Sequence, residues 1–216
     1  MKFPQSVFFD CDGVILESVN IKTEAFRDLF SDTPEHGERM TRFHLANLGV
    51  SRYDKFRYYY DEVLRRPMPE GEMERLDKEF SRLVFERILS CPMVEGAEEF
   101  FETHSRRCPM FIVSASPEPE LRRIIEARGL SRHFAGVFGS PKSKTQNVRD
   151  AVGSRKLDPE RCAFVGDAEA DWKAAKETGI PFIARLTPGK EEFWQQAGVA
   201  QVPNLVTLAE ALSRLS

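Results

Sequence analysis

The segment SVFFDCDG, residues 6–13, joins a short apolar run to two aspartates and a glycine. Its length and the abrupt stop at Gly13 favour a buried β-strand over a helix. Asp10 and Asp12 then lie just beyond the carboxyl end of that strand. The pair could form an ordinary strand-end turn, where Asp and Gly are common. It could equally supply a nucleophile and an acid–base group, and the segment alone leaves both possibilities open.

From residue 92 onward, strand-like and helix-like segments alternate. Ser116 followed by Pro117 has the pattern of a helix N-cap with proline at the first helical position. Strands alternating with helices indicate βαβ units and a parallel sheet covered on both faces. The sequence therefore predicts an α/β fold with a Rossmann-like three-layer α/β/α core. The expected strands after the first lie at residues 110–113, 134–138, 162–165 and 180–184. Four helices are expected between them: one at 94–106, one that begins at 117, one that follows the strand at 134–138 and ends at 148, and one that begins after 167.

Between residues 18 and 90 the pattern is helical throughout. Three amphipathic stretches have apolar side chains at helical spacing, around 26–30, 53–64 and 73–88. Breaks fall near Pro34, Gly49 and the turn at 67–69. We therefore expect an all-helical domain, residues 17–90, inserted into a core made of residues 1–16 and 91–216.

Composition excludes several functional classes. The 216 residues are 41% hydrophobic and 30% charged, with a formal net charge of −3. This balance gives no support for binding nucleic acid or an anionic membrane. The four cysteines are scattered, so reduced thiols are expected. The first residues show no apolar signal region, and no stretch approaches the roughly 20 apolar residues that span a bilayer, so we expect a cytoplasmic location.

Polar residues from distant parts of the chain follow the expected strands. Asp10, Ser114 and Asp167 each stand at the carboxyl end of one. In an open parallel sheet, ligands bind outside these ends, near the switch in strand order. We therefore expect the three side chains to converge in one crevice.

Four short motifs, in order, resemble those of the haloacid dehalogenase-like superfamily. The first is Phe-Phe-Asp10-Cys-Asp12-Gly-Val, which is similar to DxDGV, and the second is Val-Ser114-Ala-Ser, a serine after an apolar strand. Lys144, in GSPKSKT, resembles the third, and GDAEAD, residues 166–171, resembles the fourth, GDxxxD. The matches span nearly the whole chain, and the helical insert corresponds to the family's cap domain.

The resemblance implies a role for each residue. Asp10 would attack phosphorus, and Asp12 would protonate the leaving oxygen and then deprotonate water. Mg²⁺ would be the cofactor, and Asp171 would hold metal-bound water or orient the lysine. Lys142 competes with Lys144 for the lysine position, and each residue also has an ordinary structural interpretation, such as a helix cap for Asp167. The implied phosphate ligands are Ser114, Ala115 and Lys144, and the implied metal ligands are Asp10, the backbone carbonyl of Asp12, and Asp167.

The cap supplies the candidates for substrate specificity. Gly49-Val50-Ser51-Arg52 resembles the cap loop of the β-phosphoglucomutase-like branch, where the arginine contacts the substrate. Arg52 is accordingly the first candidate, with Lys22 and Lys55 beside it. Alternatively, Arg52 and Lys55 form the solvent-facing side of an amphipathic helix.

Asp12 argues against a dehalogenase, because a halide leaves without a proton. Lys22 and the GDxxxD motif depart from the mutase pattern, which has a histidine on the first cap helix and Glu-Asp at the fourth motif. The expected function is therefore a Mg²⁺-dependent phosphatase acting on a small phosphorylated metabolite, such as a sugar phosphate or phosphoglycolate. The alternatives are a sugar phosphomutase and a non-catalytic binding protein with the same fold. We expect a monomer or weak homodimer.

Overall fold

The computed structural model describes residues 3–31 and 33–215, except for the side chain of Glu86. The chain divides into two compact units, of which the first comprises residues 3–17 and 92–215 and the second comprises Ser18–Cys91. Each junction lies one residue later than the sequence suggested. No helix in the described residues is long and apolar enough to cross a membrane.

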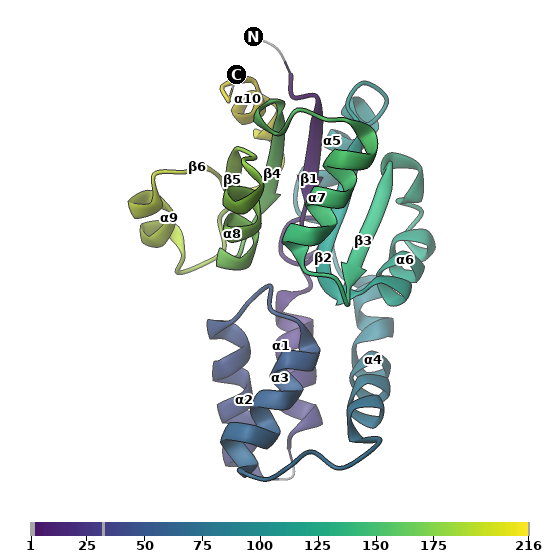
Figure 1. Cartoon of the computed structure of the whole chain (residues 1–216), viewed down its shortest axis with the longest axis vertical. Coiled ribbons are helices and arrows are strands. Elements are labelled where there is room, and N and C mark those ends of the chain that lie inside the picture. The colour runs from purple at the N-terminus through teal and green to yellow at the C-terminus, as the bar shows by residue number, and fades with distance from the viewer. Residues whose placement is uncertain (1–2, 32, 216) are drawn as a thin grey trace. The chain divides into compact units, whose positions relative to one another are not determined.

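The first unit, which we call the core, is built on a six-stranded parallel sheet with the order β3-β2-β1-β4-β5-β6 (Figure 1). This is the strand order of a Rossmann-like fold, so the predicted fold class is confirmed. The strand order reverses beside β1, which places the end of β1 at the switch point. The strands are β1 (Ser6–Phe9), β2 (Met110–Pro117), β3 (Gly136–Ser140), β4 (Cys162–Gly166), β5 (Phe182–Arg185) and β6 (Ala200–Val202).

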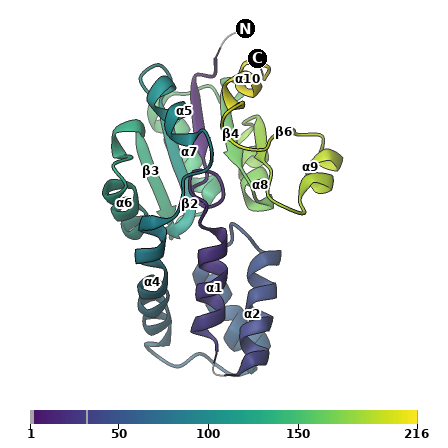
Figure 2. The ribbon, with the colours of Figure 1, turned by 180° about the vertical axis from the view of Figure 1, so that it is seen from behind.

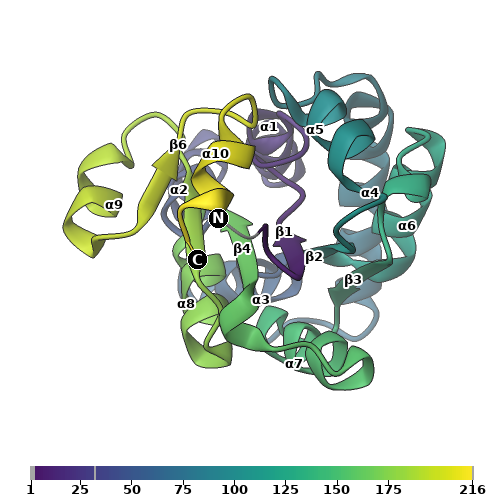
Figure 3. The same ribbon diagram turned by 90° about the horizontal axis from the view of Figure 1, so that it is seen from above.

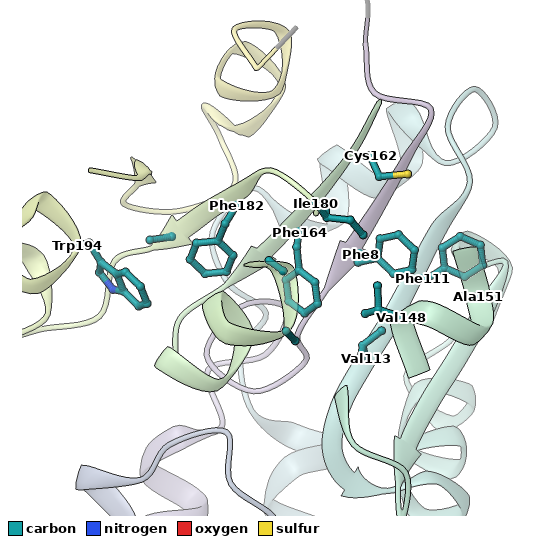
Figure 4. Packing of buried hydrophobic residues seen from close by; sticks show 13 residues of the cluster. Phe8, Phe111, Val113, Val148, Ala151, Cys162, Phe164, Ile180, Phe182 and Trp194 are labelled. Carbon is teal, nitrogen blue, oxygen red and sulfur yellow. The ribbon is translucent and has the colours of Figure 1, made fainter. Parts of the chain in front are cut away.

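Successive phenylalanines of β1 point to opposite faces of the sheet. Phe8 stacks on Phe111 of β2, with ring centroids 5.1 Å apart, and on Phe164 of β4, at 6.4 Å (Figure 4). This face packs against α7 (Lys144–Arg155) and α8 (Glu169–Thr178). Phe9 instead meets Phe101 of α5 (Ala97–His104) edge to face at 5.3 Å. Figure 3 shows α7 and α8 on one side of the sheet and α5 on the other, which makes three layers.

The end of β2 differs from the sequence prediction. Ser116 lies inside the strand and is not a helix N-cap, because β2 continues to Pro117 and α6 begins at Glu118. The extension is held by β3, where Pro117 pairs with Ser140 after a register irregularity that begins at Val113. The remaining elements, mostly unpredicted, are α6 (Glu118–Ala127), α9 (Glu191–Ala197), α10 (Leu208–Ser213) and two 3₁₀ turns (Ser131–His133 and Pro159–Arg161).

The second unit, which we call the cap, is helical, as predicted. Figure 2 shows α1, α2 and α4 of this unit. Phe26, Phe30, Phe56 and Phe80 form its buried aromatic centre. The sequence missed α2, which Thr33 caps by accepting a hydrogen bond from the His36 amide at 3.3 Å. The cap elements are α1 (Val19–Leu29), α2 (Pro34–Ala46), α3 (Arg52–Tyr58), a π-helical turn (Tyr59–Leu64) and α4 (Glu72–Ser90).

Replacing Phe8 by alanine is expected to lower the free energy of unfolding by about 3–5 kcal/mol, because it leaves a cavity between two stacked rings in the core. Urea unfolding at fixed pH measures the change. Val206→Ala is the control, since Val206 is 60% exposed and its loss should cost no more than about 0.5 kcal/mol. Equal costs for the two variants would contradict this account of the core.

Candidate active site

Four charged side chains meet at the carboxyl edge of the sheet. Asp10 directly follows β1, and its amide donates to the carbonyl of Val165 in β4 at 3.0 Å. Asp167 follows β4, and Asp171 lies in the first turn of α8. Carboxylate oxygens of Asp10, Asp167 and Asp171 lie within 4.8 Å of one another, and all three residues are at most 3% exposed. The structure thus brings together residues that are far apart in the sequence.

Lys144 is the lysine at this site. Its Nζ lies 3.0 Å from Asp10 Oδ1 and 2.5 Å from Asp171 Oδ1. Ser143 fixes the start of α7 at this residue, because its hydroxyl accepts the amide hydrogen of Gln146. Lys142, the competing residue, instead pairs with Asp150 at the surface, 2.7 Å away. Burial acts to lower the pKa of Lys144, but the charges of Asp10 and Asp171 outweigh it and hold this pKa above its ordinary value.

Asp171 holds the lysine in place. Its Oδ1 contacts Lys144, and its Oδ2 accepts a hydrogen bond from the Ala168 amide at 3.1 Å. The close approach depends on Gly166, where an added Cβ would lie 2.3 Å from the Asp171 Cβ. A glycine is therefore required at the first position of the GDxxxD motif for steric reasons. Because both of its oxygens have partners within the protein, Asp171 suits an orienting role.

The three carboxylates of this site carry more negative charge than the single positive charge of Lys144 offsets. Burial, together with the charge of Asp171, raises the pKa of Asp10 to about 7, although Lys144 opposes the rise. Burial and the charge of Asp10 also raise the pKa of Asp167 well above its ordinary value. Asp167 Oδ2 is buried and accepts no hydrogen bond from the described residues. Converging carboxylate oxygens of this kind suit a hard divalent cation such as Mg²⁺, which prefers oxygen ligands.

The end of β2 forms the other side of the site. Ser114 is 1% exposed, and its Oγ accepts a hydrogen bond from the Ser116 amide at 3.1 Å. Ala115, between them, is partly exposed. Ser116 Oγ donates to Asp12 Oδ2 at 3.4 Å, which makes Ser116 a site residue that was not predicted from the sequence. The available signal was a second serine two residues after Ser114, where side chains of a strand return to the same face.

The charged ends of two cap candidates are buried inside the cap. Arg52 Nη1 lies 3.2 Å from Asp77 Oδ1 and donates to Ser81 Oγ at 2.9 Å. Lys55 Nζ lies 2.8 Å from Nδ1 of the buried His44. Lys22, on α1, is half-buried. In this structure Arg52 and Lys55 therefore stabilise the packing of the cap helices.

Comparisons with known proteins identify the family. A sequence model of the haloacid dehalogenase-like hydrolases matches residues 4–179, and the chain belongs to this family of enzymes. The family resemblance of the four motifs is thereby confirmed.

The individual relatives share limited sequence identity with this chain. A phosphorylated carbohydrates phosphatase from Thermotoga maritima is 23% identical over 185 residues, covering 83% of each chain. A phosphoglycolate phosphatase from Mesorhizobium japonicum is 39% identical, but over only 28% of this chain and 29% of its own. A variant of CbbY from Rhodobacter sphaeroides, solved with xylulose-(1,5)bisphosphate, has a TM-score of 0.76 at 15% identity, covering 97% of this chain and 99% of its own. At that identity, the likeness shows the fold.

In metal-free protein, Asp10→Asn is expected to increase the free energy of unfolding, and by more at pH 8 than at pH 5. The pKa of Asp10 is about 7 in the folded protein, against an ordinary value of 3.8 that applies to the unfolded chain. Between these two pH values the folded state holds a proton that the unfolded state has lost. The contribution of Asp10 to the free energy of unfolding is fully present below about pH 4 and is lost as the pH rises through 7. Asparagine, which carries no charge, removes that loss.

Urea unfolding with a chelator at the two pH values measures the effect. Mg²⁺ added at pH 8 should stabilise the wild type much more than Asp10→Asn. Asp150→Asn is the matched control, because Asp150 pairs with Lys142 at the surface and its pKa is lowered. A gain from Asp10→Asn that is equal at both pH values would contradict the assignment of a raised pKa.

Proposed function

We propose that the protein is a Mg²⁺-dependent phosphatase that hydrolyses a small phosphomonoester through an aspartyl-phosphate intermediate. The observation that carries the proposal is the placement of Asp10. Its carboxylate lies buried at the switch point, 3.0 Å from Lys144, with Asp167 beside it. Phosphoryl transfer is chiefly positioning and neutralisation of charge, and these groups supply both.

In the first step, a carboxylate oxygen of Asp10 forms a bond to phosphorus, and the bond from phosphorus to the ester oxygen breaks. The electron pair stays on the ester oxygen, which takes the carboxyl proton of Asp12 and leaves as an alcohol. The hydroxyl of Ser114, the Ala115 amide and Lys144 donate to the oxygens of the moving phosphoryl group. Asp171 keeps Lys144 directed at this position, as its contact with the lysine suggests.

In the second step, a water oxygen bonds to phosphorus while Asp12 accepts the water proton. The bond from phosphorus to the Asp10 oxygen breaks, and the electron pair returns to the carboxylate. Inorganic phosphate is released, and Asp12 again carries the proton that the next cycle needs. Asp12 is suited to this double task because it is only partly buried, so that leaving alcohol and water can reach it.

Asp10, Asp167 and the backbone carbonyl of Asp12 would hold Mg²⁺. Bound there, the cation would neutralise the charge of the carboxylates and of the phosphate, which otherwise repel one another. Its fit to this chain rests on the clustered carboxylate oxygens and on the unpartnered Oδ2 of Asp167 among the described residues.

We infer the substrate class from the names of the relatives. Relatives named for phosphorylated carbohydrates and for phosphoglycolate support a small sugar phosphate or a phosphoglycolate-like ester. Hydrolysis is favoured over mutase chemistry because Lys22 stands where the mutase branch has a histidine. Arg52, Lys22 and Lys55 are proposed to influence substrate choice, with Arg52 and Lys55 acting through the packing of the cap.

Purified protein with Mg²⁺ is expected to release inorganic phosphate from at least one member of a panel of small phosphomonoesters. Asp10→Asn should lower kcat by roughly 10³-fold or more, since it removes the attacking oxygen. Asp150→Asn, which alters a surface carboxylate, should leave kcat unchanged. The proposal is wrong if the wild type hydrolyses nothing on the panel, or if Asp10→Asn keeps its activity.

A further inference from the structure

Ser116 is a buried polar residue to which the steps above give no role. It is 8% exposed, and its Oγ lies 3.4 Å from Asp12 Oδ2. The two residues come from neighbouring strands, since Asp12 follows β1 and Ser116 lies near the end of β2. The carboxyl of Asp12 must point at the ester oxygen in one step and at water in the next. A neighbour that fixes its orientation therefore bears on both steps.

The backbone holds Ser116 in this position from two sides. Its amide donates to Ser114 Oγ at 3.1 Å, within the register irregularity between Val113 and Pro117. On the other side lies Gly139 of β3, where an added Cβ would be 2.4 Å from the Ser116 carbonyl oxygen. Gly139 is itself fixed, because its carbonyl accepts a hydrogen bond from the side chain of Asn147 at 3.0 Å. The hydroxyl of Ser116 is thus presented from a rigid strand end.

We propose that Ser116 is a positioning residue that holds the Asp12 carboxyl in the orientation needed for proton transfer. The inference rests on the phosphatase function proposed above. The hydroxyl of Ser116 donates to Oδ2 of Asp12, and this oxygen stays an acceptor whether Asp12 is ionised or carries its proton on Oδ1. Ser116 therefore keeps its contact with Asp12 through both steps, and the proton on Oδ1 stays available for the ester oxygen.

Two substrates that differ in their leaving group test the proposal. 4-Nitrophenolate leaves without needing a proton, whereas an alkyl alcohol requires one from Asp12. Because kcat/KM reports events up to the first transfer of phosphate, Ser116→Ala should lower it about 10-fold for the alkyl phosphate that the wild type hydrolyses fastest. That factor is what one hydrogen bond to an acid–base group supplies. For 4-nitrophenyl phosphate, kcat/KM should change by less than about 2-fold.

Two further variants separate positioning from a structural role. Ser116→Thr keeps a hydroxyl and should restore the alkyl phosphate activity. Ser140→Ala is the matched control, because Ser140 is 6% exposed on the adjoining strand and its Oγ has no hydrogen-bond partner among the described residues. It should leave both values of kcat/KM unchanged.

A fall by the same factor for both substrates in Ser116→Ala, or no fall for either, would overturn the inference and leave the phosphatase function standing. Wild-type protein that hydrolyses neither substrate would instead overturn the phosphatase function itself. The two failures are therefore distinguishable.

Discussion

Repulsion between buried carboxylates is the constraint that the rest of the core has to offset. Asp10, Asp167 and Asp171 approach one another within 4.8 Å at an edge where water is largely excluded. Lys144 offsets part of this charge through contacts with Asp10 and Asp171. The remaining charge is costly in a protein that holds no cation or protons there. Under the proposed function, a bound divalent cation would offset this repulsion and would attract an anionic phosphoryl group to the site.

The packing of the sheet makes the carboxylate cluster possible, because it stabilises the folded state and so offsets the repulsion between the carboxylates. The faces of β1 are filled by phenylalanines, with Phe8 stacked between Phe111 and Phe164 and Phe9 against α5. The parallel neighbours β1 and β4 end at the same edge of the sheet, so Asp10 and Asp167 lie close together although they are far apart in the sequence. Glycines then allow the last approach: Gly166 admits Asp171, and Gly139 admits the backbone of Ser116.

Much of the core was predictable from sequence, because an apolar run that stops at a carboxylate indicates both a strand and the residue at which the strand ends. Asp10 and Asp167 were placed in this way, whereas Ser114, expected at the end of its strand, lies inside β2, which continues to Pro117. Lys144 was favoured over Lys142 for its place near the start of a helix, but the sequence separates the two poorly. The hydrogen bond that the Ser143 hydroxyl accepts from the Gln146 amide shows where α7 begins. Ser116 was placed wrongly, because Ser-Pro is equally suited to a helix start, and pairing with β3 decided the outcome. The three-residue β6 was too short to show a sequence period. The contacts of Arg52 with Asp77 and of Lys55 with His44 join different helices of the cap, so no local pattern predicts them.

The measurement that tests the central claim most directly is diffraction from crystals soaked in Mn²⁺, a scatterer that substitutes for Mg²⁺. We expect an anomalous peak bound by carboxylate oxygens of Asp10 and Asp167, with metal–oxygen distances close to the roughly 2.0–2.1 Å of Mg²⁺. Lys144 should stay on Asp10 and Asp171, and the peak should vanish in Asp167→Asn. Crystals that bind no Mn²⁺ between Asp10 and Asp167, or that bind it equally after Asp167→Asn, would contradict the account.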